Sequence, residues 1–149
     1  MGYTIRDAEA GDEKEWRRLW AAYLDFYDVT LDPEITESTW RRILDPESPI
    51  KMRVAATPGG LLGFAVYLPH PSTWVKNMDC YLEDLYIDEN LRGQGIGRAL
   101  IDDLIELCKA NGWERLYWHT DEENSRARKL YDSYVKTDGH VRYRMKING

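Results

Sequence analysis

The sequence predicts a mixed α/β domain, and three features of the chain support this class. A run of β-forming residues over 78–87 leads into a glycine-rich turn and then into an amphipathic helix pattern. Apolar residues spaced three and four apart mark helices, whereas apolar residues that alternate with charged ones mark strands. Helix and strand patterns follow one another along the whole chain, so we expect one sheet packed against helices.

The first elements in the chain are a short strand and two helices. The strand is expected over 3–6, and the first helix over 12–28, where apolar side chains crowd one broad face. Asp32 or Thr36 caps the second helix, which ends before Pro46.

A hairpin follows these helices. Its strands cover 51–56 and 61–68, and a turn at 58–60 joins them. Gly63 lies inside the second strand, which indicates a bulge or the close approach of another backbone. We expect residues 69–77 to form a loop.

The second half begins with the central strand over 78–87 and contains a strand–helix–strand unit. Gly112 ends the helix that follows the glycine-rich turn. A short strand over 115–119 and a helix over 125–134 come next. In the last predicted strand, over 141–147, apolar and basic residues alternate, which is typical of a half-buried strand.

Length and composition predict a single domain over residues 1–149. The net charge of −6 disfavours a nucleic-acid partner, because phosphate binding needs a basic surface. No apolar run is long enough to span a membrane, and no secretory signal pattern is present. The two cysteines, Cys80 and Cys108, fall in predicted buried elements, which favours reduced thiols and a cytoplasmic protein.

The glycine-rich turn has the chemistry of a phosphate site. Gly93, Gly95 and Gly97 let the backbone turn sharply and approach a ligand, and the first amides of the helix have no partner within it. Arg92 and Arg98 add positive charge on either side. The turn is not a Walker A loop or a Rossmann fingerprint, because the required lysine and third small residue are absent. A glycine-rich connection with surface arginines is the alternative.

The spacing Arg92-x-x-Gly95-x-Gly97 resembles the signature of the Gcn5-related N-acetyltransferase (GNAT) family. The resemblance implies the GNAT fold, an α/β fold in which a mixed central sheet of six or seven strands has helices on both faces and splayed central strands. It also implies acetyl-CoA as co-substrate. By this resemblance the cofactor-binding residues are Leu85, Tyr86, Ile87, Arg92, Gly93, Gln94, Gly95, Ile96, Gly97, Arg98 and Asn124.

Glu83 is the candidate catalytic base. Deprotonating a lysine-like amine at pH 7 costs about 4.6 kcal/mol, so a primary amine acceptor calls for a nearby carboxylate or an ordered water. Strand alternation places Glu83 with Leu85, and half-burial would raise its pKa. The local sequence is similar to that of diamine acetyltransferases, in which the next residue, here Asp84, lies near the amine. An ion pair with an arginine is the alternative.

Tyr131 is the candidate acid that protonates the leaving thiolate. Asn124-x-x-Ala127-x-x-Leu130-Tyr131 resembles the family's second motif, in which the asparagine binds the pantetheine arm. Tyr131 as a core residue and Asn124 as a helix cap are the alternatives. The chain departs from the pattern at Val135, since the expected glycine arrives only at Gly139.

Aromatic residues of the first two helices, Tyr23, Tyr27 and Trp40, are candidates to line an amine site, as in the family. Negative potential there would come from Asp28, Asp32, Glu34 and Glu37. An aromatic core with a solvated acidic loop is the alternative. His119 ends the short strand and could relay a proton, His70 and His140 look like loop residues, and no metal-binding pattern is present.

These observations predict an acetyl-CoA-dependent N-acetyltransferase that acts on a primary amine, of a polyamine-like small molecule or of a lysine or amino acid, by direct attack in a ternary complex. A non-catalytic module that binds and senses acyl-CoA is the alternative. Homodimers are common in the family, so the resemblance also implies a possible homodimer.

Overall fold

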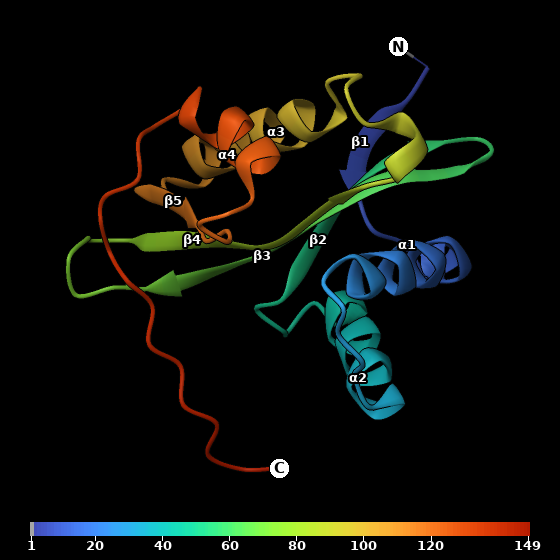
Figure 1. Cartoon of the computed structure of the whole chain (residues 1–149), viewed down its shortest axis with the longest axis horizontal. Helices are drawn as coiled ribbons and strands as arrows, with labels where there is room; N and C mark the ends of the chain where they lie inside the picture. The colour runs from blue at the N-terminus through green and yellow to red at the C-terminus, as the bar shows by residue number, and fades with distance from the viewer. Residues whose placement is uncertain (1) are drawn as a thin grey trace. The chain divides into compact units, whose positions relative to one another are not determined.

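The computed structural model describes residues 2–149, which form two compact units. One unit ends at Trp118 and the other runs from His119 to Gly149. The larger unit holds a five-stranded sheet in sequential order, with four antiparallel strands and a fifth parallel to its neighbour (Figure 1). The strands are β1 (Thr4–Asp7), β2 (Lys51–Thr57), β3 (Gly60–Pro71), β4 (Met78–Ile87) and β5 (Arg115–Trp118).

The expected α/β class is confirmed, although the sheet has five strands rather than six or seven. Helices α1 (Glu13–Phe26) and α2 (Pro33–Leu44) lie on one face of the sheet and α3 (Ile96–Asn111) lies on the other (Figure 1). Two short 3₁₀ turns, η1 (Ala10–Asp12) and η2 (Glu89–Leu91), precede α1 and α3.

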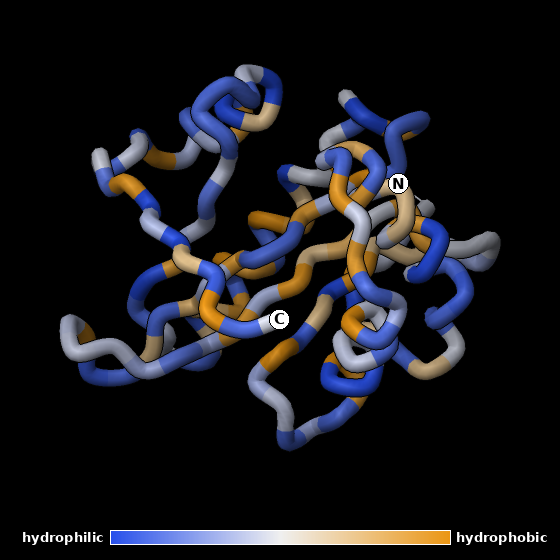
Figure 2. The backbone as a smooth tube through the Cα atoms, turned by 60° about the horizontal axis from the view of Figure 1, so that its bottom comes forward, coloured by the Kyte–Doolittle hydropathy of each residue, from blue (hydrophilic) through white to orange (hydrophobic). Residues whose placement is uncertain are grey.

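Successive side chains of β2 point to opposite faces of the sheet. Met52 and Val54 join the core beneath α1 and α2, whereas Arg53 points to α3 and binds Asp103 at 2.8 and 3.0 Å. Hydrophobic and hydrophilic residues thus alternate along the strands. Figure 2 shows this as orange segments interrupted by blue or pale ones.

Three tryptophans form the centre of the core under α1 and α2. The Trp16 ring stacks on Trp20 at 5.2 Å and on Trp40 at 5.1 Å, and Trp16 is fully buried. Trp40 keeps only 3% of its surface exposed, so the prediction that it lines an amine site is wrong. Burying a large apolar side chain stabilises the fold by roughly 1.5–3 kcal/mol, which explains why these rings fill the interior.

A β-bulge interrupts β4 at Glu83. Leu82 pairs with Tyr67 and Asp84 pairs with Val66, so Glu83 is the extra residue without a partner on β3. The bulge inverts the faces of β4: before it, Cys80 faces α3 and contacts Cys108, whereas after it Asp84 faces α1. Both cysteines are free and buried, as predicted.

A second irregularity surrounds Gly63 in β3. Ala55 pairs with Gly63 and Ala56 pairs with Leu61, which leaves one extra residue in β3. A Cβ on Gly63 would lie 2.7 Å from the Tyr86 carbonyl oxygen. The structure therefore confirms the expected close approach of another backbone.

The two central strands, β4 and β5, pair only over a short stretch. Residues 79–82 of β4 pair with residues 115–118 of β5. Within residues 2–149, Glu83 has no ladder partner, and residues 84–87 of β4 pair with β3 alone. The parallel pairing between β4 and β5 therefore stops just before the bulge.

Helix ends follow the expected capping signals. The Asp32 carboxylate accepts a hydrogen bond from the Glu34 N–H at 2.9 Å, which caps α2. Gly112 ends α3 in a left-handed conformation with φ of 71°, as predicted. In the described part of the chain, no helix is long and apolar enough to cross a membrane.

The smaller unit contains one helix, α4 (Ser125–Asp132), and a C-terminal segment without regular structure. The strand predicted over 141–147 is wrong, because these residues form no strand and their apolar side chains are exposed by 74% or more (Figure 1). Alternation of apolar and basic residues makes a strand only where a neighbouring strand can accept its backbone hydrogen bonds, and this unit offers none among residues 119–149.

Candidate functional site

The glycine-rich turn between β4 and α3 leaves the start of α3 open. Gly93 and Gly95 have φ of +83° and +81°, a region that side chains disfavour. Gly95 is the residue before α3, so no side chain caps the helix, and its first turn carries no acidic residue. A Cβ built on either glycine would have no atom within 4 Å. A helix start that no side chain caps, a free approach at the glycines and the positive end of a helix suit a phosphate group.

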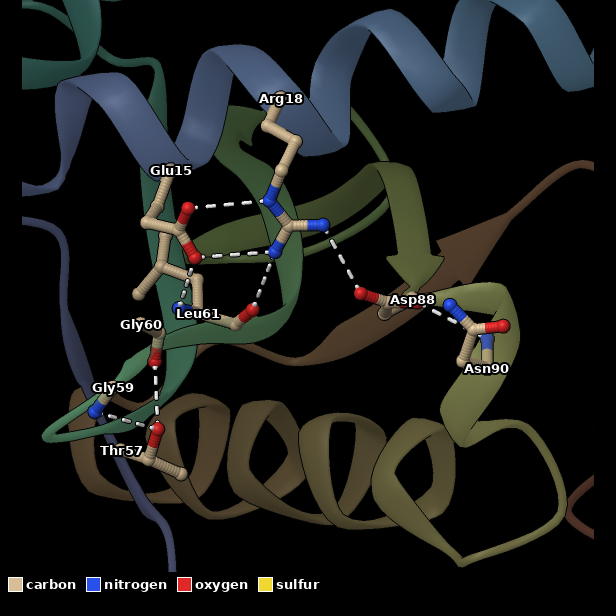
Figure 3. Close-up of polar contacts among 8 residues, drawn as sticks. All are labelled: Glu15, Arg18, Thr57, Gly59, Gly60, Leu61, Asp88 and Asn90. Carbon is tan, nitrogen blue, oxygen red and sulfur yellow. Dashed lines mark hydrogen bonds and ion pairs between the residues drawn. The ribbon is translucent and has the colours of Figure 1, made fainter.

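Arg18 of α1 anchors the chain where it leaves β4 (Figure 3). Its guanidinium donates to Glu15 at 3.1 and 3.2 Å, to the Leu61 carbonyl at 3.3 Å and to Asp88 at 3.1 Å. The other oxygen of Asp88 accepts from the Asn90 N–H at 3.1 Å and so starts η2. This network joins α1, the hairpin and the first residue after β4, so the glycine-rich turn begins from a fixed point.

The side chain of Arg92 turns toward aromatic rings. Its guanidinium carbon lies 4.9 Å from the centre of the Phe26 ring and 5.5 Å from the centre of the Tyr86 ring. Both distances are within the range of a cation–π interaction. Arg92 therefore lies against the end of α1 and β4.

Asp84, just after the bulge, is half-buried and is the less exposed of the two carboxylates in this region. It accepts a hydrogen bond from the Tyr23 hydroxyl at 2.6 Å. Burial raises the pKa of Asp84 to about 6, the Tyr23 hydrogen bond partly opposes this, and the negative charge of Glu83 adds to it. Burial and the adjacent Asp84 charge also raise the pKa of Tyr23, which therefore stays a neutral phenol. A carboxyl group that titrates near pH 6 can accept a proton under neutral conditions.

Glu83 itself is exposed, so its predicted half-burial is wrong. The prediction assumed strict alternation along β4, which placed Glu83 with Leu85. The bulge breaks that alternation: Leu85 pairs with Ala65 on the α3 face, whereas the charge of Glu83 acts on Asp84 and Tyr23 on the α1 face. Two acidic side chains therefore meet at one point of the sheet.

Aromatic rings from α1, β3 and β4 surround this acidic pair. Tyr23 makes edge contacts with Tyr27 at 5.2 Å, Phe64 at 5.9 Å and Tyr86 at 5.8 Å. Phe26 packs on Tyr27 at 5.0 Å, and these two side chains keep 52% and 42% of their surface exposed. Two of the five rings are thus open to solvent beside a half-buried carboxylate.

Of the four other acidic residues expected near an amine, two make contacts that stabilise the fold and two are exposed. Asp32 caps α2, and Glu37 forms an ion pair with Arg17. Asp28 is exposed and has a positive φ of 53° just after α1. Glu34 is exposed in the first turn of α2.

The other predicted residues lie on both units. Leu85 and Ile87 pair with β3, and the Tyr86 side chain is buried in the core. His70 lies in β3 and contacts the Tyr117 hydroxyl at 2.7 Å, so its expected loop position is wrong. In the smaller unit, Asn124 caps α4 by accepting from the Ala127 N–H at 3.2 Å.

Tyr131 and His119 also belong to the smaller unit. Tyr131 is half-buried on α4, on the face shared with Ala127 and Leu130, as its spacing predicts. His119 is exposed.

Sequence reasoning missed the coupling of Asp84 to Tyr23 and the position of Phe26. The helical spacing places Phe26 on the apolar face of the first helix, but it does not indicate that this ring stays exposed beside Arg92. Two adjacent carboxylates in the middle of a strand were a signal of irregularity, since both cannot avoid the interior of a regular strand without a bulge. No periodicity indicates which of the two is buried.

The chain is similar to known acetyltransferase sequences. A sequence model of the acetyltransferase (GNAT) family matches residues 14–134. A D-amino-acid N-acetyltransferase of Saccharomyces cerevisiae is 33% identical over 148 residues, which cover 98% of this chain and 91% of that protein. A thialysine N-epsilon-acetyltransferase of Bos taurus is 29% identical over 143 residues, which cover 90% of this chain and 84% of that protein.

Solved structures show the same fold. A possible acetyltransferase from Clostridium difficile superimposes with a TM-score of 0.85 over the full length of both chains, at 17% identity. The matched length includes both compact units.

Proposed function

This chain belongs to the acetyltransferase (GNAT) family, and we propose that it uses acetyl-CoA to acetylate a small primary amine. The observation that carries the proposal is the bulge at Glu83, because it brings two carboxylates together on β4. From that strand the chain continues directly into a turn suited to a phosphate group. An anion-binding turn and an acidic, aromatic site for a cation therefore flank the same strand end.

The open turn supports the assignment of acetyl-CoA. The backbone amides of Gly93 to Arg98 would hold its pyrophosphate, because they start a helix that no side chain caps. Acetyl-CoA would supply an acetyl group activated as a thioester. Asn124 remains a candidate for the pantetheine arm, and Leu85 and Ile87 remain candidates through their backbone.

The acidic pair supports an amine as the acceptor. Glu83 and Asp84 provide negative charge, and exposed aromatic faces nearby attract cations. The amine must lose a proton before it attacks, and a positioned base offsets roughly 3–5 kcal/mol of that cost. We assign proton removal to this pair. Asp84 has a pKa of about 6, close to neutral pH, and Glu83 is the more accessible of the two.

The proposed reaction is direct attack by the amine in a ternary complex, with Tyr131 as the group that protonates the leaving thiolate. Substituting Tyr131→Phe retains the ring and removes only the hydroxyl. We expect kcat to fall while the KM for acetyl-CoA stays similar. An unchanged kcat would remove Tyr131 from the mechanism.

The test is release of the CoA thiol from acetyl-CoA in the presence of single amines: spermidine, thialysine, and the D- and L-forms of several amino acids. These amines include the acceptors after which the two relatives are named. We expect release with at least one amine and none without amine.

Two further variants locate the base. Asp84→Asn should abolish the acidic limb of the kcat/KM profile near pH 6, whereas Glu83→Gln should weaken amine binding and leave that limb in place. The reverse pattern would make Glu83 the base. If calorimetry detects acetyl-CoA binding but no amine releases thiol, the chain is a sensor of acyl-CoA and the enzymatic proposal is wrong.

A further inference from the structure

We propose that Arg18 is a positioning residue for acetyl-CoA binding, because it holds Asp88, the residue from which the chain enters the glycine-rich turn. The inference rests on the proposed function, since it concerns the turn assigned to the pyrophosphate of acetyl-CoA. Arg18 belongs to α1, the helix that carries Tyr23 and Phe26 of the acceptor side. Its action on acetyl-CoA is indirect and passes through the backbone that Asp88 fixes.

The first support is that Arg18 bonds to a part of β3 that β4 does not reach. β3 pairs with β4 only from Gly63 onward, so Leu61 lies beyond the end of that ladder. The Leu61 N–H donates to Glu15 at 3.2 Å, and the Leu61 carbonyl accepts from Arg18 at 3.3 Å (Figure 3). Two side chains of α1 thus satisfy backbone groups that no residue of β4 pairs with.

The second support is that the neighbouring hairpin turn makes room for this contact. Gly60 has φ of +143°, a conformation that favours glycine, and a Cβ on it would overlap the Glu15 carboxylate. Glu15 in turn accepts from two nitrogens of Arg18 at 3.1 and 3.2 Å, which fixes the plane of the guanidinium. The third nitrogen is thereby directed at Asp88, 3.1 Å away.

The third support is the number of contacts that meet at Asp88. Its N–H donates to the Leu62 carbonyl at 2.9 Å, and its own carbonyl accepts from the Leu91 N–H at 2.8 Å. One carboxylate oxygen accepts from the Asn90 N–H at 3.1 Å and the other binds Arg18. Within residues 2–149, Arg18 is the one ion-pair partner of Asp88, whose side chain is only 17% exposed.

The turn that follows depends on how its ends are held. Residues 89–91 form η2, which joins Asp88 directly to the turn. A Cβ built on Gly93 or Gly95 would have no atom within 4 Å, so no packed neighbour restrains these positions from that side. Glycines lose more conformational freedom on ordering than other residues do. Fixing Asp88 therefore lowers the entropic cost of ordering the amides that bind the pyrophosphate.

The experiment measures acetyl-CoA binding by calorimetry, and the KM values for acetyl-CoA and for the amine, in the wild type and in variants of this pair. Arg18→Met removes the donors and keeps an unbranched side chain, and Arg18→Lys keeps the charge. Asp88→Asn removes the charge and keeps an oxygen for the Asn90 N–H. Arg17→Met is the matched control, because Arg17 lies on the same helix but forms its ion pairs within α1 and with α2.

We expect Arg18→Met to weaken acetyl-CoA binding by about 3- to 10-fold, a modest loss because the Arg18 side chain is partly exposed. The KM for acetyl-CoA should rise in parallel, whereas the KM for the amine and the acidic limb near pH 6 should stay unchanged. Arg18→Lys should recover part of the loss. Adding Asp88→Asn to Arg18→Met should weaken binding little further, because both changes remove the same contact. Arg17→Met should alter neither KM.

Hydrogen exchange in the free protein gives a readout that does not need acetyl-CoA. The amides of Asp88, Asn90 and Leu91 are hydrogen-bonded through this junction and should exchange about threefold faster or more in Arg18→Met. Amides in the C-terminal half of α3 should exchange as in the wild type. Melting temperatures of all variants separate these local effects from global unfolding.

Three results would overturn the inference: unchanged acetyl-CoA binding in Arg18→Met, additive losses in the double variant with Asp88→Asn, or an equal loss in Arg17→Met. A wild type that binds no acetyl-CoA would refute the proposed function instead. Faster exchange of the three amides in Arg18→Met would in that case still support Arg18 as the residue that holds the turn, and unchanged exchange would refute it.

Discussion

Removal of the Tyr23 hydroxyl by Tyr23→Phe tests the electrostatics of the buried pair. The ring would remain packed against Phe64 and Tyr86, so the change isolates the 2.6 Å hydrogen bond to Asp84. A hydrogen bond to a charged group contributes about 1.5–3 kcal/mol and one between neutral groups about 0.5–1.5 kcal/mol. The cost of Tyr23→Phe should therefore depend on whether Asp84 is ionised.

The direction follows from the raised pKa of Asp84. In the folded protein the pKa is about 6, against an ordinary value of 3.8, so folding favours the protonated carboxyl. The resulting contribution to the free energy of unfolding, about 3 kcal/mol, is present below pH 4 and is lost as the pH rises through 6. Tyr23→Phe raises the pKa of Asp84 further, because the hydrogen bond that stabilises the ionised form is gone.

The assay is urea unfolding of the wild type and Tyr23→Phe at pH 4.5 and at pH 8. We expect a difference in the free energy of unfolding of about 1 kcal/mol at pH 4.5 and about 2 kcal/mol at pH 8. The other carboxylates contribute equally to both proteins and cancel in the difference. In an Asp84→Asn background, the effect of Tyr23→Phe should no longer vary with pH.

A difference between the wild type and Tyr23→Phe that stays constant from pH 4.5 to pH 8 would refute the reasoning. It would mean that Asp84 does not change its ionisation while bonded to Tyr23. A pH-dependent difference that persists in Asp84→Asn would point to another titrating group.

Three further changes test parts of the fold that support the site. Gly63→Ala places a Cβ 2.7 Å from the Tyr86 carbonyl and should destabilise the protein by about 1–3 kcal/mol in thermal unfolding, whereas little change would mean that the strands adjust freely. Gly95→Ala forces a side chain into a left-handed conformation, at a cost of about 1–2 kcal/mol, and should raise the KM for acetyl-CoA; an unchanged KM would argue against a phosphate site at this turn. Arg53→Met leaves Asp103 without its partner and should cost about 2 kcal/mol, because both side chains are partly exposed, and adding Asp103→Leu should restore much of the loss.

Local signals in the sequence predicted most element boundaries. The central strand was predicted over 78–87, where β4 lies, because its flanks are clear. Asp32 and Gly112 mark helix ends through hydrogen bonds and backbone conformations that involve only nearby residues. Such signals are readable because the interaction that ends the element lies within a few positions of the chain.

The remainder of the site depends on interactions between distant residues. The Tyr23–Asp84 hydrogen bond spans 61 positions, and Arg92 meets Phe26 across a similar distance in the chain. Whether Glu83 or Asp84 is buried depends on how β4 pairs with β3, which alternation within β4 cannot reveal. The same limit explains the wrong strand at 141–147, where alternation is present but no paired strand exists in that unit.

Glu83 is an extra residue in the central strand. After it, odd- and even-numbered residues of β4 therefore face the opposite sides of the sheet from those they face before it. Deleting Glu83 would close the bulge into a regular ladder in which Asp84 still pairs with Val66, so the residues after it would keep their faces and the strand would lose only the extra carboxylate. In relatives, a one-residue gap at this position would therefore mark the loss of the acidic group beside Asp84, and with it a different acceptor chemistry.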